Sequence, residues 1–138
     1  MRSYLLLIFI CLLITSCREN RNLVLAIEKI DVSLLEKEEI LIIPYHGCSN
    51  CITKAFKYLK REPNELNRAV VFTNYSSTKE IKLRLQSLDL NLTGALYTNK
   101  HQELMKDGIS HFYPSLLRKS AGQDWVIDIV NPSSTVLD

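Results

Sequence analysis

Residues 40–60 read ILIIPYHGCSNCITKAFKYLK and join two different hydrophobic patterns. Residues 40–43 form a short, continuous apolar run, which is typical of a strand covered on both faces. After Ser49 the apolar residues recur at helical spacing until Pro63 stops the helix; they are Ile52, Ala55, Phe56 and Leu59. A buried strand that leads directly into an amphipathic helix indicates an α/β unit, and Cys48 and Cys51 lie at its junction.

The residues that follow continue this alternation of strands and helices. Residues 69–72 predict a second buried strand, and Ser77 begins a capping-box pattern that opens a helix. Residues 94–98 predict a third strand, and residues 101–107 predict a helical turn or two closed by Gly108. Two last strands, at 115–117 and 125–130, flank a turn at 121–124. This order predicts an α/β sandwich whose sheet is parallel in its first part and antiparallel in its last.

Residues 22–35, which precede the first strand, have the spacing of an amphipathic helix. Its apolar face would hold Leu23, Ile27, Ile30 and Leu34. The β-branched residues around Val24 leave a strand as the alternative.

The overall composition indicates one folded domain. The chain has 138 residues, of which 46% are apolar and 23% are charged, so it can bury a core. The net charge of +2 gives no reason to expect a nucleic-acid partner, because such affinity comes from clustered Lys and Arg. We expect a monomer that needs no cofactor.

Residues 1–17 have the pattern of a secretory signal. Arg2 is followed by a nearly uninterrupted apolar run at 4–14, which includes Cys11 and is about half of the ~20 residues that a membrane-spanning helix needs. The run ends in LITSC at 13–17, which resembles the lipobox of bacterial lipoproteins. The resemblance implies that residues 1–16 are a signal peptide and that Cys17 is acylated, for example with palmitate.

This reading divides the chain into a signal peptide at 1–16, a polar tether at 17–22 and a domain at 23–138. It also implies a lipid-anchored protein of the bacterial cell envelope, either periplasmic or associated with the outer membrane. The alternatives are an uncleaved membrane anchor, or a signal that is cut nearby and leaves Cys17 free.

Cys48 and Cys51 are the candidate catalytic residues. The free amides and the positive dipole end of a helix would favour the thiolate of Cys48, and Cys51, one turn further on, could resolve a mixed disulfide. A purely structural disulfide is the alternative, although so short a loop gives a small gain in loop-closure entropy. A c-type haem would need histidine where Ile52 stands. Structural zinc usually takes four ligands, so we predict no metal site. The histidines that could join the two cysteines as ligands are His46, His101 and His111. We expect His101 and His111 to be surface or turn residues.

The segment 40–60 resembles the active-site strand, turn and helix of the thioredoxin superfamily. Residues 108–117, GISHFYPSLL, are similar to the segment of that family that ends in a cis-proline followed by an apolar strand. The resemblance implies that Pro114 packs against the disulfide in the cis form and that Tyr113 and Pro114 receive the substrate. An ordinary proline at the start of a strand is the alternative.

The resemblance implies a three-layer α/β/α sandwich with a mixed sheet, and several features depart from the family pattern. Gly47 replaces the usual tryptophan, and Ser49-Asn50 replace Gly-Pro. No carboxylate lies in the buried strand before the cysteines, where many members keep a proton acceptor. Residues 131–134 read as a tail, so the closing helix is short or absent.

The function implied by the resemblance is thiol–disulfide exchange with protein thiols or disulfides in the cell envelope. His46 could favour the Cys48 thiolate, or it could be a solvent-facing loop residue. The cysteine spacing also resembles the heavy-metal-associated domains, which bind copper through paired thiolates. A thioredoxin-fold binding module without redox activity is a third possibility.

Overall fold

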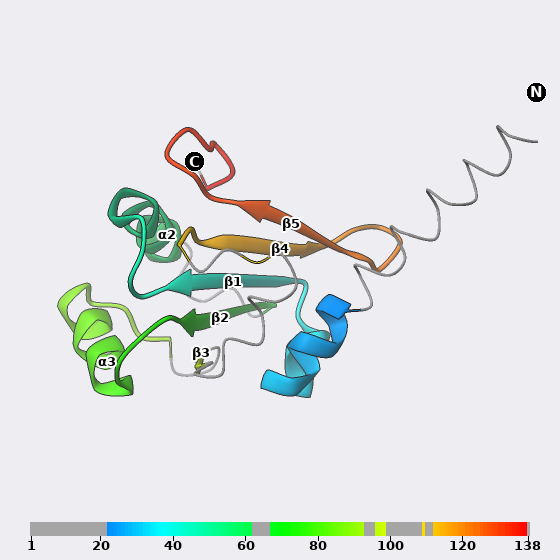
Figure 1. The fold of residues 1–138 in the computed structure, drawn as a ribbon, viewed down its shortest axis with the longest axis horizontal. Coiled ribbons are helices and arrows are strands. Elements are labelled where there is room, and N and C mark those ends of the chain that lie inside the picture. The colour runs from blue at the N-terminus through cyan, green and yellow to red at the C-terminus, as the bar shows by residue number, and fades with distance from the viewer. Residues whose placement is uncertain (1–21, 62–66, 93–95, 99–108, 110–111, 138) are drawn as a thin grey trace, which may run out of the picture.

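The computed structural model describes residues 22–61, 67–92, 96–98, 109 and 112–137. Its centre is a five-stranded sheet in the order β3-β2-β1-β4-β5 (Figure 1). β2 pairs with β1 and β3 in parallel, whereas β4 pairs with β1 and β5 antiparallel. The predicted mixed sheet is therefore confirmed, and its strands are β1 (Glu39–Pro44), β2 (Arg68–Thr73), β3 (Leu96–Thr98), β4 (Ser115–Lys119) and β5 (Trp125–Ile129).

Helices cover both faces of the sheet and make a thioredoxin-like α/β/α sandwich. Alternate residues of a strand face opposite sides, so β1 contributes to two cores. Leu41 and Ile43 pack with α2 (Ser49–Arg61) and α3 (Thr78–Ser87) on one face. Ile40 and Ile42 pack on the other face with the helix at 22–30 and a short 3-10 helix, η1 (Val32–Glu36). The N-terminal helix lies near the beginning of β1, whereas α2 begins beyond its end (Figure 1).

The predicted helix at 22–35 is present but is divided by Asp31. The α-helix covers 22–30, and Asp31 then takes extended backbone angles, φ −166° and ψ 126°. Its carboxylate accepts a hydrogen bond from the amide of Ser33 at 2.8 Å and caps η1. The chain therefore changes direction at this residue, and Leu34 still reaches the core.

A polar cluster stands at the end of the sheet where β1 begins. The carboxylate of Glu39 forms ion pairs with Arg68 and, at 3.4 Å, with Arg118. The hydroxyl of Tyr58 donates to the same carboxylate and accepts a hydrogen bond from Arg68 at 2.8 Å. Because the Arg68 side chain is only 5% exposed, its charge needs these partners.

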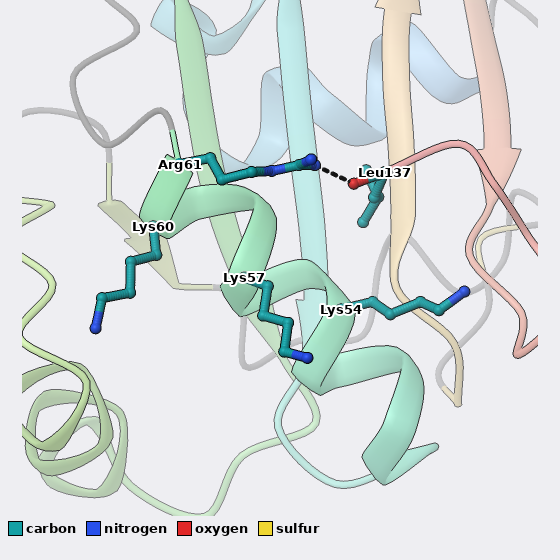
Figure 2. A pocket seen from close by; sticks show the side chains of 5 residues that line it. All are labelled: Lys54, Lys57, Lys60, Arg61 and Leu137. Atoms are coloured by element: carbon teal, nitrogen blue, oxygen red, sulfur yellow. Dashed lines mark hydrogen bonds between the residues drawn. The ribbon is translucent and has the colours of Figure 1, made fainter.

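The C-terminal segment, residues 130–137, occupies the face beside α2 without forming a helix. Leu137 is buried in the α2 core, and its carbonyl accepts a hydrogen bond from Arg61 (Figure 2). The ammonium of Lys54 donates to the carbonyls of Pro132 at 3.2 Å and Ser134 at 2.9 Å. Lys54 and Arg61 therefore fix this segment to α2, and a cavity of about 320 Å³ remains beside Lys57, Lys60 and Leu137. The predicted tail is packed against the domain.

Candidate functional site: a disulfide at the start of α2

Cys48 and Cys51 form a disulfide at the junction of β1 and α2, with their Cα atoms 5.3 Å apart. Cys48 precedes the first helical residue, and its carbonyl accepts the amide of Ile52 at 2.9 Å, as a helix-capping residue does. The sulfur of Cys48 accepts a hydrogen bond from the amide of Cys51 at 3.3 Å. Cys51 is fully buried, whereas Cys48 is half-buried. A reagent arriving from solvent would thus meet Cys48 first.

The segment that leads to Cys48 is bonded on one side to the chain that follows β2. The register of β1 and β2 ends at Pro44 and Thr73. Beyond it, the amide of Tyr45 donates to the carbonyl of Thr73 at 2.8 Å, and the amide of His46 donates to the carbonyl of Asn74 at 3.2 Å. The side-chain amide of Asn74 donates back to the carbonyl of His46 at 2.6 Å. The sheet pairing therefore extends to within two residues of Cys48.

The same segment is bonded on its other side to the loop that enters β4. The amide of Cys48 donates to the carbonyl of Phe112 at 2.9 Å. A Cβ atom at Gly47 would stand 2.3 Å from that carbonyl oxygen, which is closer than real contacts allow. Gly47 therefore permits the close approach of two main-chain segments. A larger residue at position 47 would therefore force these segments apart.

Pro114 directly precedes β4 and does not have the expected peptide geometry. It is buried, and its carbonyl accepts the amide of Val130 at 2.8 Å, so it lies beside β5. No cis peptide bond occurs within the described residues, so the Tyr113–Pro114 bond is trans. The expectation of a cis-proline was wrong. The alternative fits, because a proline has no amide to donate and is accommodated directly before a strand.

Two aromatic residues directly precede Pro114 in the chain. Phe112 is 50% exposed, and its ring packs edge-on against the ring of Tyr113, with centroids 5.0 Å apart. Tyr113 is half-buried. The Phe112 carbonyl bonds to the amide of Cys48, so the main chain of this aromatic segment is joined to the start of α2. Tyr113 and Pro114 were predicted site residues, whereas the bond between Phe112 and Cys48 was not predicted, although Phe112 lies in the same segment.

His46 precedes Cys48 by two residues and lies at the surface. Its ring is exposed and meets the ring of Tyr45 edge-on, with centroids 5.0 Å apart. The described contacts of His46 include no hydrogen bond to either cysteine sulfur. Its effect on the thiolate therefore stays a prediction, and its observed contribution is the pair of main-chain bonds to Asn74.

Three residues considered in the sequence analysis fall outside the described part of the chain. They are Cys17, the predicted lipidation site, and His101 and His111, which we expected to be surface or turn residues. Among the residues that the structure describes, no group of three or more His, Cys, Asp or Glu side chains could hold a metal ion. Within the same ranges, no helix combines the length and the apolar character that a membrane crossing requires.

The arrangement can support chemistry at sulfur. A helix start directs unpaired amides and a partial positive charge toward the first cysteine, which favours its thiolate when the disulfide is reduced. The second cysteine is already at bonding distance and is shielded from solvent. Ser115 directly follows Pro114. Its hydroxyl is buried and has no hydrogen-bond partner among the described residues.

Comparison of the chain with known proteins gives no relative from which a function could be taken. No protein-family model and no curated protein matches it. The assignment of a function therefore depends on the thioredoxin-like sandwich and on the disulfide at its helix start.

Proposed function

We propose that this protein is a thiol–disulfide oxidoreductase that acts on protein thiols or disulfides through Cys48 and Cys51. The observation that carries the proposal is the difference in exposure within one disulfide. Cys48 is half-buried at the helix start, and Cys51 is sealed beneath it with its amide donating to the Cys48 sulfur at 3.3 Å. A structural crosslink has no need of an accessible sulfur at a thiolate-stabilising position.

The reaction consists of two exchange steps. In the reduced protein the Cys48 thiolate attacks one sulfur of a substrate disulfide, forming a mixed disulfide, and the other substrate sulfur leaves as a thiolate that takes a proton. The Cys51 thiolate then attacks the Cys48 sulfur, releases the second substrate thiol and closes the Cys48–Cys51 bond. Two electrons pass to the substrate. The same steps in reverse oxidise a substrate dithiol, and the relative potentials of the two proteins decide the direction.

A redox titration tests the proposal most directly. The full chain with Cys11→Ser and Cys17→Ser retains only the two cysteines of the domain. Equilibration in glutathione buffers, followed by alkylation and mass analysis, should give one two-electron transition within the range of the known oxidoreductases, about −270 to −120 mV. A bond that stays oxidised in every buffer would contradict the proposal. Stoichiometric, tight binding of Cu(I) by the reduced pair in the presence of a competing thiol would favour the copper-binding alternative.

Trapping distinguishes the roles of the two cysteines. In cells, Cys51→Ser should accumulate mixed disulfides with partner proteins, because the resolving thiol is missing. Cys48→Ser should accumulate none, since the remaining sulfur is buried. Equal trapping by both variants would remove the assignment of Cys48 as the nucleophile. The absence of any phenotype in Cys48→Ser, with partner binding retained, would support a redox-inactive binding module.

The cellular setting forms part of the proposal. We place the protein in a bacterial cell envelope, held on a membrane by acylation of Cys17, because the LITSC sequence at 13–17 has the lipobox pattern. Acyl chains contribute about 0.8 kcal/mol per buried methylene, so several chains hold a domain durably. Metabolic labelling with a palmitate analogue should mark the wild-type chain and leave Cys17→Ser unlabelled. Label that persists in the variant would exclude this site.

A further inference from the structure

Asn74 has an unusual backbone conformation at the end of the sheet that carries the disulfide. Three described residues other than glycine have a positive φ: Asn74 at 48°, Asp89 at 55° and Gln123 at 68°. Asp89 follows the C-cap of α3, and Gln123 lies in the turn between β4 and β5, where such angles are common. Asn74 follows β2 directly. Backbone conformations of this kind often mark functional sites, and here the contacts of the residue indicate its use.

Asn74 bonds to one partner through two different groups. Its main-chain carbonyl accepts the amide of His46 at 3.2 Å, and its side-chain amide donates to the carbonyl of His46 at 2.6 Å. Both polar groups of the His46 main chain are therefore satisfied by Asn74. Asparagine suits this position because it tolerates the left-handed region and carries a short side-chain donor.

The opposite side of the same segment is also hydrogen-bonded, to the loop before β4. Two residues beyond His46, the amide of Cys48 donates to the carbonyl of Phe112. The main chain at Gly47 lies so close to that carbonyl that no Cβ atom would fit between them. The segment 46–48 is thus fixed between the end of β2 and the loop before β4. The residue at the end of this segment, Cys48, has its sulfur 3.3 Å from the amide of Cys51.

We propose that Asn74 is a positioning residue of the Cys48 site, which holds the segment 46–48 so that the nucleophilic sulfur meets the helix start. The inference depends on the proposed thiol–disulfide exchange. When the side-chain bond is lost, the segment can move away from β2, and the sulfur of the reduced protein spends less time at the amides that stabilise its thiolate. The loss should therefore appear in the redox equilibrium as well as in stability.

Two substitutions at Asn74 and one matched control separate these effects. Asn74→Gly keeps the left-handed backbone and removes the donor, so it should fold. Asn74→Asp keeps the size of the side chain and places an acceptor against the carbonyl of His46. Asp89→Gly makes the same kind of change at a positive-φ residue just beyond the C-cap of α3.

Each variant is made in the full chain that lacks Cys11 and Cys17, and its equilibrium constant with glutathione is measured. Because the reduced form loses stabilisation of its Cys48 thiolate, a net hydrogen bond of ordinary strength predicts that both Asn74 variants change this constant by about three- to tenfold in favour of the disulfide. The alkylation rate of the reduced protein against pH should also show a higher pKa for Cys48. Asp89→Gly should match the parent in both measurements.

The possible results are distinct. If the parent chain exchanges with glutathione and the Asn74 variants behave as Asp89→Gly does, the positioning role is wrong and the proposed function stands. If the Asn74 variants lose only unfolding free energy, with an unchanged equilibrium constant and alkylation profile, Asn74 is merely structural and the inference again fails. If the parent chain itself does not exchange, both proposals fall together.

Discussion

The amide of Cys48 donates to the carbonyl of Phe112 across 2.9 Å, which joins the start of α2 to the loop that enters β4. Both groups belong to the main chain, so this link does not depend on the side chain at either position. It joins the main chain of an exposed aromatic residue to that of the half-buried Cys48. The disulfide, the Phe112 loop and the end of β2 consequently form one connected site.

Gly47→Ala should disturb this site more than its small size suggests. The new Cβ would lie 2.3 Å from the Phe112 oxygen, so one main-chain segment must move and the hydrogen bond from Cys48 must lengthen. We expect a loss of about 1–3 kcal/mol in unfolding free energy, as for other overpacked positions, together with slower exchange of the disulfide. Gly122→Ala is the control, because the nearest atom to its Cβ would be 3.8 Å away. Equal stability of the two variants in urea would contradict the close approach at Gly47.

Glu39→Gln should destabilise the fold and leave disulfide exchange nearly unchanged. The substitution removes the charge that Arg68 and Arg118 share, and Arg68 is almost completely buried. We expect a loss of about 2–3 kcal/mol in unfolding free energy, measured in urea because guanidinium salt would screen the charges. Glu38→Gln changes the neighbouring exposed carboxylate and should have little effect. Equal losses in the two variants would show that the cluster adds nothing to stability.

Leu137→Ala should show that the C-terminal segment belongs to the folded domain. The side chain is 4% exposed and packs in the core that α2 covers. We expect a loss of about 2 kcal/mol, the lower end for a buried leucine, because the site lies at the edge of that core. Leu83→Ala is the matched control, since Leu83 is 55% exposed on α3. If both variants unfold at the same denaturant concentration, the segment is not anchored as the structure indicates.

Asp31 should make the N-terminal region sensitive to acid. The hydrogen bonds from the side chain and the amide of Ser33 lower the pKa of Asp31 below its ordinary 3.8. A carboxylate with a depressed pKa contributes stability that is fully present above its unfolded pKa and is lost as pH falls through the folded pKa. The contribution should therefore be complete at neutral pH and disappear below pH 3.8. NMR titration of the Asp31 carboxyl should give this lowered midpoint, and Ser33→Ala should raise it.

The hydrophobic periodicity of the sequence was sufficient to predict most of the fold. Residues 40–43 and 69–72 were predicted as strands and became β1 and β2, because an uninterrupted apolar run can be buried on both faces. Ser77 was predicted to open a helix, and it caps α3 by accepting the amide of Glu80. The boundary at Asp31 was missed, because a capping aspartate inside a helical pattern cannot be distinguished by spacing alone. The third strand was confirmed at Leu96–Thr98, and residues 94–95 lie outside the described ranges.

The candidate site was only partly predictable. The spacing of Cys48 and Cys51 at a strand-to-helix junction was sufficient to predict the disulfide, since adjacent helical turns bring such residues together. The bonds of Asn74 and Phe112 to the Cys48 segment were not predictable, because they join residues that are distant in the sequence through their main chains. The trans geometry of the Tyr113–Pro114 bond also could not be inferred, because the quoted segment fits either a cis-proline or an ordinary strand-start proline.

The helix at 22–30 and the disulfide lie toward opposite ends of β1 (Figure 1). A fusion partner, an affinity tag or a solid support joined ahead of this helix would therefore leave the reactive sulfur facing bulk solution. Exchange assays on immobilised protein should give the same rate constants as assays on free protein, which makes direct capture of partner proteins on a column practical.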